Sequence, residues 1–288
     1  MTMLVHPGEL AARLSSIFNE LNAESICLHT DLASIGPLAG AKARMEQVEG
    51  YAAVFLSALS ERILLLPTFN YSYPMTRVYD VQKDPCEVGA LNEYFRKNIK
   101  SRRTRTPVFN FCVVGDKKNI FNTEDLADPF SSGSIFAQMV EYRTWMGFMG
   151  TSLRSFSFAH YVEHVADVGY RYYKSFPGRV IDGLFESQTD FGYKVRVLHP
   201  DYINENDWEK IDREMTASGV LRKYALGNGE LLLFRCDHAF SYWSDVLRKD
   251  DLYVFTDRAR HSIEDLQKRF GYPFTLEMFE EPRGSRCA

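Results

Sequence analysis

The chain has 288 residues, of which 45% are hydrophobic and 25% charged, so it is long enough to bury a large globular core. Its net charge of −4 argues against nucleic-acid binding as the main function. No apolar run approaches the roughly 18 residues that a membrane-spanning helix needs, and the N-terminus lacks the basic and apolar segments of a signal peptide. We therefore expect a soluble, cytoplasmic protein without membrane insertion.

The first 70 residues alternate between helices and apolar strands. Apolar residues at helical spacing predict helices over residues 8–21 and 48–59. Short apolar runs predict strands at 25–29 and 63–66, and the second run is apolar throughout, as in a strand buried on both faces. This alternation predicts the α/β class, as a layered α/β/α domain with a mixed central sheet.

The remainder of the chain continues this alternation after one irregular stretch. Residues 70–88 contain two prolines and predict a long loop, which at this length is usually functional or mobile. Further helices are expected at 89–99, 134–142, 156–166, 208–217 and 239–249, and strands at 108–114, 145–149, 193–198 and 231–234. Because no linker or repeat interrupts the chain, we predict a single domain over residues 1–288, in which residues 190–255 add an αβ layer and 256–288 form a peripheral tail.

The five cysteines stand at positions 27, 86, 112, 236 and 287. Their number is odd and no two have C-x-x-C spacing, which predicts reduced thiols rather than a disulfide framework or a structural zinc site. Cys112 lies in an apolar strand, where a thiol usually serves for core packing.

The string HYVEH at 160–164 is the strongest candidate for a functional site. On a helix, residues three and four apart are neighbours, so His160, Glu163 and His164 would share one face. Such a group can act as a general base, with the carboxylate fixing the tautomer of a histidine. The string also matches H-x-x-E-H, a zinc-peptidase motif that would need a third ligand. A solvated helix face is the third interpretation, and the string alone does not decide among them.

Two other segments have a functional and a structural interpretation. Serines and a glycine at 129–134 precede an apolar helix, where they fit an anion site or a helix cap. The basic segment KSRRTRTP at 100–107 fits phosphate recognition or a solvated loop.

Five segments, taken in order, resemble the motifs of one family. They are LHTDL at 28–32, LLLPTF at 64–69, GALNEYFR at 89–96, PFSSGSIF at 129–136 and HYVEH at 160–164. This ordered set resembles the aminoglycoside 3-N-acetyltransferase family, which is distinct from the GNAT acetyltransferases, over roughly residues 8 to 255. The resemblance implies an antibiotic N-acetyltransferase-like fold. It also implies transfer of an acyl group from acetyl-coenzyme A, or another acyl-coenzyme A, to an amine on a sugar-like ring, with no metal.

The resemblance also implies roles for individual residues. His160 is expected to be the base that deprotonates the amine and Glu163 its orienting carboxylate, with His164 as the alternative base. The residues expected to bind the cofactor are His29, Thr30, Asp31, Leu32, Ser34, Arg103, Thr104 and Arg105. Those expected to bind the acceptor are Thr68, Tyr71 and Asp80.

Departures from the family pattern bear on the acceptor. Thr106 stands where the family often has histidine, an additional arginine stands at 105, and Asp31 replaces a serine. Aminoglycosides are polycations, whose sites should carry carboxylates, whereas additional arginines suit coenzyme A phosphates or an anionic acceptor. We therefore hypothesise an N-acyltransferase that acts on an amino sugar, including a nucleotide-linked one for a surface polysaccharide, in a chain that could form homo-oligomers.

Three alternatives remain open at this stage. They are an aminoglycoside 3-N-acetyltransferase that confers antibiotic resistance, a zinc-dependent hydrolase that uses H-x-x-E-H, and a non-catalytic binding protein on the same fold, since a fold does not determine a function.

Overall fold

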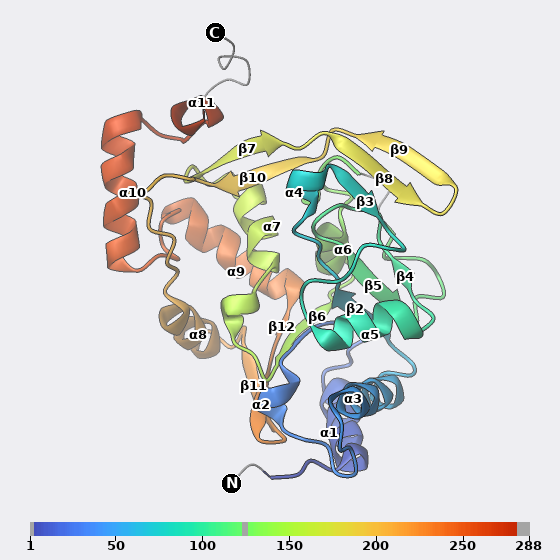
Figure 1. The fold of residues 1–288 in the computed structure, drawn as a ribbon. Coiled ribbons are helices and arrows are strands. Elements are labelled where there is room, and N and C mark those ends of the chain that lie inside the picture. Colours follow the sequence, from blue (N-terminus) through green and yellow to red (C-terminus); the bar gives the residue numbers. More distant parts are fainter. Residues whose placement is uncertain (1–2, 123–125, 281–288) are drawn as a thin grey trace.

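A seven-stranded mixed sheet forms the centre of the computed structural model, which describes residues 3–122 and 126–280 (Figure 1). The strand order is β11-β12-β6-β1-β2-β5-β4. These strands are β1 (Ser25–Thr30), β2 (Ile63–Pro67), β4 (Arg102–Arg103), β5 (Phe111–Val114), β6 (Trp145–Met149), β11 (Arg222–Leu226) and β12 (Gly229–Arg235). β1 runs parallel to both β2 and β6, and the other neighbouring pairs are antiparallel. The predicted α/β class with a mixed sheet is thus confirmed.

Helices cover both faces of this sheet (Figure 1). On one face, α1 (Pro7–Glu20), α3 (Arg44–Ala58) and α5 (Ala90–Asn98) contribute to one apolar cluster. On the other face, α6 (Ile135–Glu141), α7 (Phe158–Val165) and α9 (Cys236–Lys249) contribute to a second cluster. Strand residues alternate between the two: Leu64 and Leu66 lie in the first and Leu65 in the second, because successive side chains of a strand point to opposite faces. The run at 63–66 is therefore buried on both faces, as predicted.

Two small sheets stand beside the central one, at the top of Figure 1. One pairs β7 (Arg171–Ser175) with β10 (Gly192–Arg196) in antiparallel orientation. The other contains β3 (Val78–Asp80), β8 (Gly178–Asp182) and β9 (Phe185–Thr189). The stretch predicted to be an irregular loop thus contains β3, and also the short helix α4 (Tyr73–Thr76). Of the four strands between 171 and 196, only the last was predicted.

The C-terminal third is joined to the rest of the fold more closely than the sequence suggested. β12 pairs with β6, so this segment extends the central sheet instead of adding a separate layer. The remaining helices are α8 (Trp208–Ala217), α10 (Asp257–Phe270) and α11 (Leu276–Phe279). α10 buries Ala259, Ile263 and Leu266 in the second cluster, so the described part of the predicted peripheral tail belongs to the core. Residues 281–288 lie outside the described residues.

The turn after β1 is tightly fixed. The Asp31 amide donates to the carbonyl of Met149 at 2.8 Å, and the short helix α2 (Leu32–Ile35) begins directly afterwards. Gly150 has φ +70°, and a Cβ there would lie 2.3 Å from the Asp31 carbonyl oxygen. A glycine at this position therefore allows the end of β6 to approach the turn that follows β1.

The described cysteines, 27, 86, 112 and 236, are all free thiols, and Cys287 lies outside the described residues. Cys112 is buried in β5, in agreement with a packing role. Within residues 3–122 and 126–280, no helix is both long and apolar enough to cross a membrane.

Candidate active site

Two clefts open where β1 ends. The first cleft, of about 700 Å³, lies against α7 and the β7–β10 pair, and His160 and Glu163 are among the residues that line it. The second cleft, of about 520 Å³, is lined by the turn 30–33 and by residues of α3 and α5. Thr30 lines both clefts, so they adjoin at the C-terminal end of β1.

His160 and Glu163 form the predicted pair on α7. His160 Nδ1 lies 3.0 Å from Glu163 Oε2, at the one-turn spacing that brings positions three apart together on a helix. The imidazole is 28% exposed, whereas the carboxylate is 6% exposed. With Nδ1 donating to the carboxylate, the other ring nitrogen is the one available to accept a proton.

Two neighbours of Glu163 were not predicted from the sequence. The Arg171 guanidinium lies 2.9 Å from Oε2, and the Tyr170 hydroxyl donates to Oε1 at 2.9 Å. Burial alone would raise the pKa of the Glu163 carboxyl, but Arg171 and His160 lower it to about 2. The carboxylate is therefore charged at any physiological pH.

The surroundings of His160 favour its neutral form by lowering its pKa. Burial lowers its pKa below the ordinary value, the hydrogen bond to Glu163 opposes this effect, and the charge of Arg171 adds to it. A neutral imidazole near pH 7 can accept a proton, which a general base requires.

His164, the alternative base, is turned away from this pair. Its Nε2 lies 3.5 Å from Asp128 Oδ2, and its ring packs against Phe130 at 5.7 Å between centroids. It is not among the residues that line the first cleft. The structure thus brings together two of the three residues proposed as catalytic, and the shared helix face extends only to His160 and Glu163.

The zinc interpretation has no ligand set within the described part of the chain. Over residues 3–122 and 126–280, no three histidine, cysteine, aspartate or glutamate side chains cluster as metal ligands would. In addition, Arg171 lies within hydrogen-bonding distance of both His160 and Glu163. A cation is therefore already present where the metal would bind.

The turn residues predicted to bind the cofactor divide between the two clefts. His29 lines the first, where its Nε2 lies 3.3 Å from Ser157 Oγ, its ring stacks on Phe148, and burial lowers its pKa to about 4. Thr30, Asp31 and Leu32 line the second cleft. The Asp31 carboxylate caps α2, accepting from the Ala33 amide and from the Ser34 hydroxyl. The Ser34 hydroxyl thus donates its proton within the turn, to Asp31.

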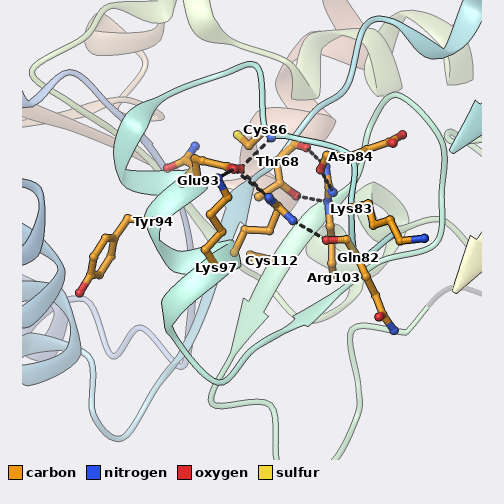
Figure 2. Close-up of polar contacts among 12 residues, drawn as sticks. Thr68, Gln82, Lys83, Asp84, Cys86, Glu93, Tyr94, Lys97, Arg103 and Cys112 are labelled. Atoms are coloured by element: carbon orange, nitrogen blue, oxygen red, sulfur yellow. Dashed lines mark hydrogen bonds and ion pairs between the residues drawn. The ribbon is translucent and has the colours of Figure 1, made fainter. Parts of the chain in front are cut away.

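The basic segment does not provide the predicted phosphate contacts. Figure 2 shows the Arg103 side chain next to Thr68 and to the loop residues Gln82, Lys83 and Asp84. It donates to the carbonyls of Thr68, Val81 and Asp84 at 2.7, 3.1 and 2.6 Å, and Nε donates to Asn110 Oδ1 at 2.9 Å. Arg103 is 8% exposed. Its donors are used to hold this loop, which corrects the expectation that it binds the cofactor.

Thr104 and Arg105 also have structural partners. The Thr104 hydroxyl is buried and accepts from the Phe111 amide at 2.9 Å. Arg105 pairs with Asp182 at 2.9 Å and lies over the ring of Phe185. Neither residue is among those that line either cleft, so both expectations are corrected in the same way.

A second contact network holds the same loop from α5 (Figure 2). Glu93 accepts from the Cys86 amide at 2.8 Å and from Arg96 Nε at 2.7 Å, and Arg96 donates to the carbonyl of Gln82 at 2.6 Å. Burial would raise the pKa of Glu93, but these donors lower it to about 2. The stretch predicted as an irregular excursion is therefore anchored by two arginines.

Of the predicted acceptor residues, only Tyr71 lines the first cleft. Thr68 is fully buried and donates to Asn110 Oδ1 at 2.9 Å. Asp80 accepts from the amides of Gln82 and Lys83, which is the role of a turn residue. At 129–134, Ser134 caps α6 by accepting from the Ala137 amide at 3.2 Å, so the capping interpretation is confirmed.

Sequence reasoning missed most of the charged lining of the first cleft. The basic residues that line it are Arg154, Arg171, Lys174, Lys194 and Arg196. Four of them belong to the β7–β10 pair, for which the sequence predicted a strand near residue 193 but none near 171. The two adjacent tyrosines in RYYKS at 171–175 were the available signal for this strand, because aromatic residues are enriched in strands.

Comparison with known proteins agrees with this geometry. A family model described as aminoglycoside 3-N-acetyltransferase matches residues 27–248. Similar solved structures include AAC-IIIb in a binary complex with CoASH (19% identity, 83% of this chain and 96% of that chain, TM-score 0.67). They also include aminoglycoside acetyltransferase AAC(3)-Xa (15%, 86% and 94%, TM-score 0.68) and the YokD protein from Bacillus subtilis (14%, 88% and 97%, TM-score 0.66). At these identities the structures show a shared fold. No curated protein sequence matches the chain.

The two neighbouring arginines of the basic segment should differ in their effect on stability. Arg103→Ala leaves two buried carbonyls and one partly buried carbonyl without this donor, and should lower the free energy of unfolding by about 3 kcal/mol. Arg105→Ala, the matched control, removes a surface ion pair and should cost only about 0–1 kcal/mol. Denaturant titration measures both. A weakened coenzyme A affinity of the Arg105→Ala protein would restore the cofactor role for this segment.

Proposed function

The chain belongs to the aminoglycoside 3-N-acetyltransferase family, and on this basis we propose that it transfers an acetyl or similar acyl group to the amine of an amino sugar. As a member of this family it is an acyl-coenzyme A-dependent N-acetyltransferase with a small-molecule amine as acceptor. The proposal concerns the acceptor and the residues that act. Nucleotide-linked amino sugars destined for a surface polysaccharide are the acceptors that we favour.

The observation that carries the proposed mechanism is the 3.0 Å contact between His160 Nδ1 and the buried Glu163 carboxylate, on the wall of the first cleft. A protonated amine has no lone pair for attack, so His160 first takes a proton from it. The amine nitrogen then attacks the thioester carbonyl, the new C–N bond forms, and the C–S bond breaks. Coenzyme A leaves as a thiolate, which the proton held by His160 neutralises, and the acylated nitrogen releases its second proton to the solvent. Glu163 stabilises the imidazolium while it carries the first proton.

The second cleft is the proposed site of the acyl-coenzyme A. It adjoins the first at Thr30, so a thioester placed there would meet an amine bound beside His160. The Asp31 carboxylate occupies the start of α2 and would repel a phosphate at that point. Arg44, at the start of α3, is the basic residue that lines this cleft and the proposed partner of the coenzyme A phosphates.

An aminoglycoside is the second candidate acceptor, and the description of the matching family favours it. Aminoglycosides are polycations, however, and among the described residues that line the first cleft Glu163 is the one carboxylate, already paired with Arg171. The cleft therefore lacks the acidic lining that a polycation would need, and this observation favours the amino-sugar acceptor.

Binding and acceptor assays test the proposed function. Calorimetric titration with acetyl-coenzyme A should show saturable binding near one site per chain. Acetylation should then proceed faster with nucleotide-linked amino sugars than with kanamycin-type aminoglycosides, measured by release of the coenzyme A thiol. Faster acetylation of the drugs would establish the second candidate. Failure to bind either acetyl-coenzyme A or coenzyme A would overturn the proposed use of the second cleft.

The two histidines of α7 should respond differently to substitution. His160→Ala should lower kcat by at least about 10²-fold, because general-base assistance is lost, while coenzyme A affinity stays nearly constant. His164→Ala is the matched control, since this residue pairs with Asp128 and should change kcat only a few-fold. A large loss of coenzyme A affinity with little loss of turnover in His160→Ala would contradict the assigned role.

The acid limb of the pH profile should report His160. Because its pKa lies below the ordinary value of about 6.5, kcat/KM should fall only as the pH drops below that value and the imidazole becomes protonated. Glu163→Gln removes a carboxylate that raises the pKa of His160, while Arg171 remains. The inflection should therefore move to lower pH and the maximal rate should fall.

The measurement is the initial rate of both proteins between about pH 4.5 and about pH 8.5, a range that covers the titration of histidine. The substitution also leaves Arg171 buried without its partner, at a cost of roughly 3–5 kcal/mol, so the folded fraction must be followed by circular dichroism. An inflection that stays in place, or moves to higher pH, would show that another group titrates.

A further inference from the structure

The wall of the first cleft contains two arginines in direct opposition. Arg171 of β7 and Arg196 of β10 are partners in the antiparallel register, and like charges directly opposite each other in a sheet are destabilising. Arg171 is neutralised by Glu163. Within residues 3–122 and 126–280, no carboxylate lies within ion-pair distance of Arg196. The pair therefore carries one positive charge more than its surroundings neutralise.

The other basic residues that line the cleft differ in whether a carboxylate pairs with them. Lys174 pairs with Glu280 and Lys194 with Asp167, each at 2.5 Å. Arg154, on the 3₁₀ turn Leu153–Ser155, is exposed, and no described carboxylate pairs with it. After pairing, Arg154 and Arg196 remain as the uncompensated charges that line the cleft. A repulsive arrangement of this kind is expected where function requires it.

We propose that Arg196, together with Arg154, forms an oxyanion-binding subsite in the first cleft, which holds a phosphate or carboxylate group of the amino-sugar acceptor. The inference rests on the proposed function and specifies the chemistry of its substrate. A guanidinium group matches both oxyanions, because it offers parallel N–H donors to two oxygens. The subsite would also remove the repulsion between Arg196 and Arg171, since the bound anion would neutralise the excess charge.

Two further observations on the same wall agree with this assignment. The Nε of Arg171 is buried and has no hydrogen-bond acceptor among the described residues, so a further donor is available beside Arg196. Aromatic side chains, including Phe176, Tyr193 and Trp208, line the same cleft. Their flat faces suit a sugar ring or a nucleobase. The cleft thus offers both an anionic and a stacking contact to a phosphorylated amino sugar.

Matched acceptors that differ only in the oxyanion test this proposal. We would measure kcat/KM with acetyl-coenzyme A for glucosamine, glucosamine 1-phosphate and 2-amino-2-deoxyglucuronic acid. At least one oxyanion-bearing acceptor should exceed glucosamine by about tenfold or more, the factor expected for a charged hydrogen bond. The comparison between the phosphate and the carboxylate identifies which oxyanion is preferred.

Substitution of Arg196 then assigns the preference to the subsite. In Arg196→Gln the ratio of kcat/KM between the preferred acceptor and glucosamine should fall towards one, and Arg196→Lys should retain part of it. The matched control is Arg179→Gln, because Arg179 is exposed on β8, pairs with Glu186 and does not line the cleft. Its ratio should equal that of the unsubstituted protein.

Calorimetric titration with glucosamine 1-phosphate and with the amino uronic acid, in the presence of coenzyme A, separates this proposal from the proposed function. Binding that Arg196→Gln weakens, without turnover, would support the subsite and reject the acyl transfer to amino sugars. Turnover of amines with no preference for an oxyanion, or a preference that survives in Arg196→Gln, would overturn the subsite alone. Neither turnover nor oxyanion binding would reject both.

Discussion

The carboxylate of Glu163 is buried beside the first cleft, where a charge is stable only if other groups neutralise it. Arg171, Tyr170 and the imidazole of His160 share this task. The contact with Glu163 orients the His160 imidazole, and the ion pair between Glu163 and Arg171 joins α7 to β7. One buried charge thus orients the candidate base and joins α7 to the neighbouring cleft wall.

The arginines of this chain show how the same side chain serves opposite purposes according to burial and partners. Arg103 is enclosed and donates to three backbone carbonyls, so it holds the loop 80–86 in place. Arg171 is enclosed but paired with a carboxylate. Arg196 lines open space without such a partner. An arginine in the sequence therefore indicates little about ligand binding until the partners of its guanidinium group are known.

The sequence revealed those features that depend on local pattern. Helical periodicity predicted α1 and α3, the apolar run at 63–66 predicted β2, and one-turn spacing predicted the contact between His160 and Glu163. It could not predict that Arg171 completes this pair, because that contact depends on how a strand folds back against the helix. The role of Arg103 was equally hidden, since its acceptors are carbonyls of Thr68 and of the loop 80–86, which lie far from Arg103 in the sequence.

The lining of the two clefts comes from different stretches of the chain. The second is built from residues between 30 and 51 and between 89 and 91, whereas the charged wall of the first comes largely from the paired strands β7 and β10. Because that wall lies outside the central sheet, its surface residues can change without disturbing the strands that support the second cleft. The fold thus allows selectivity for one reaction partner to diverge during evolution, or to be redesigned by exchanging one contiguous segment, while the other partner is retained.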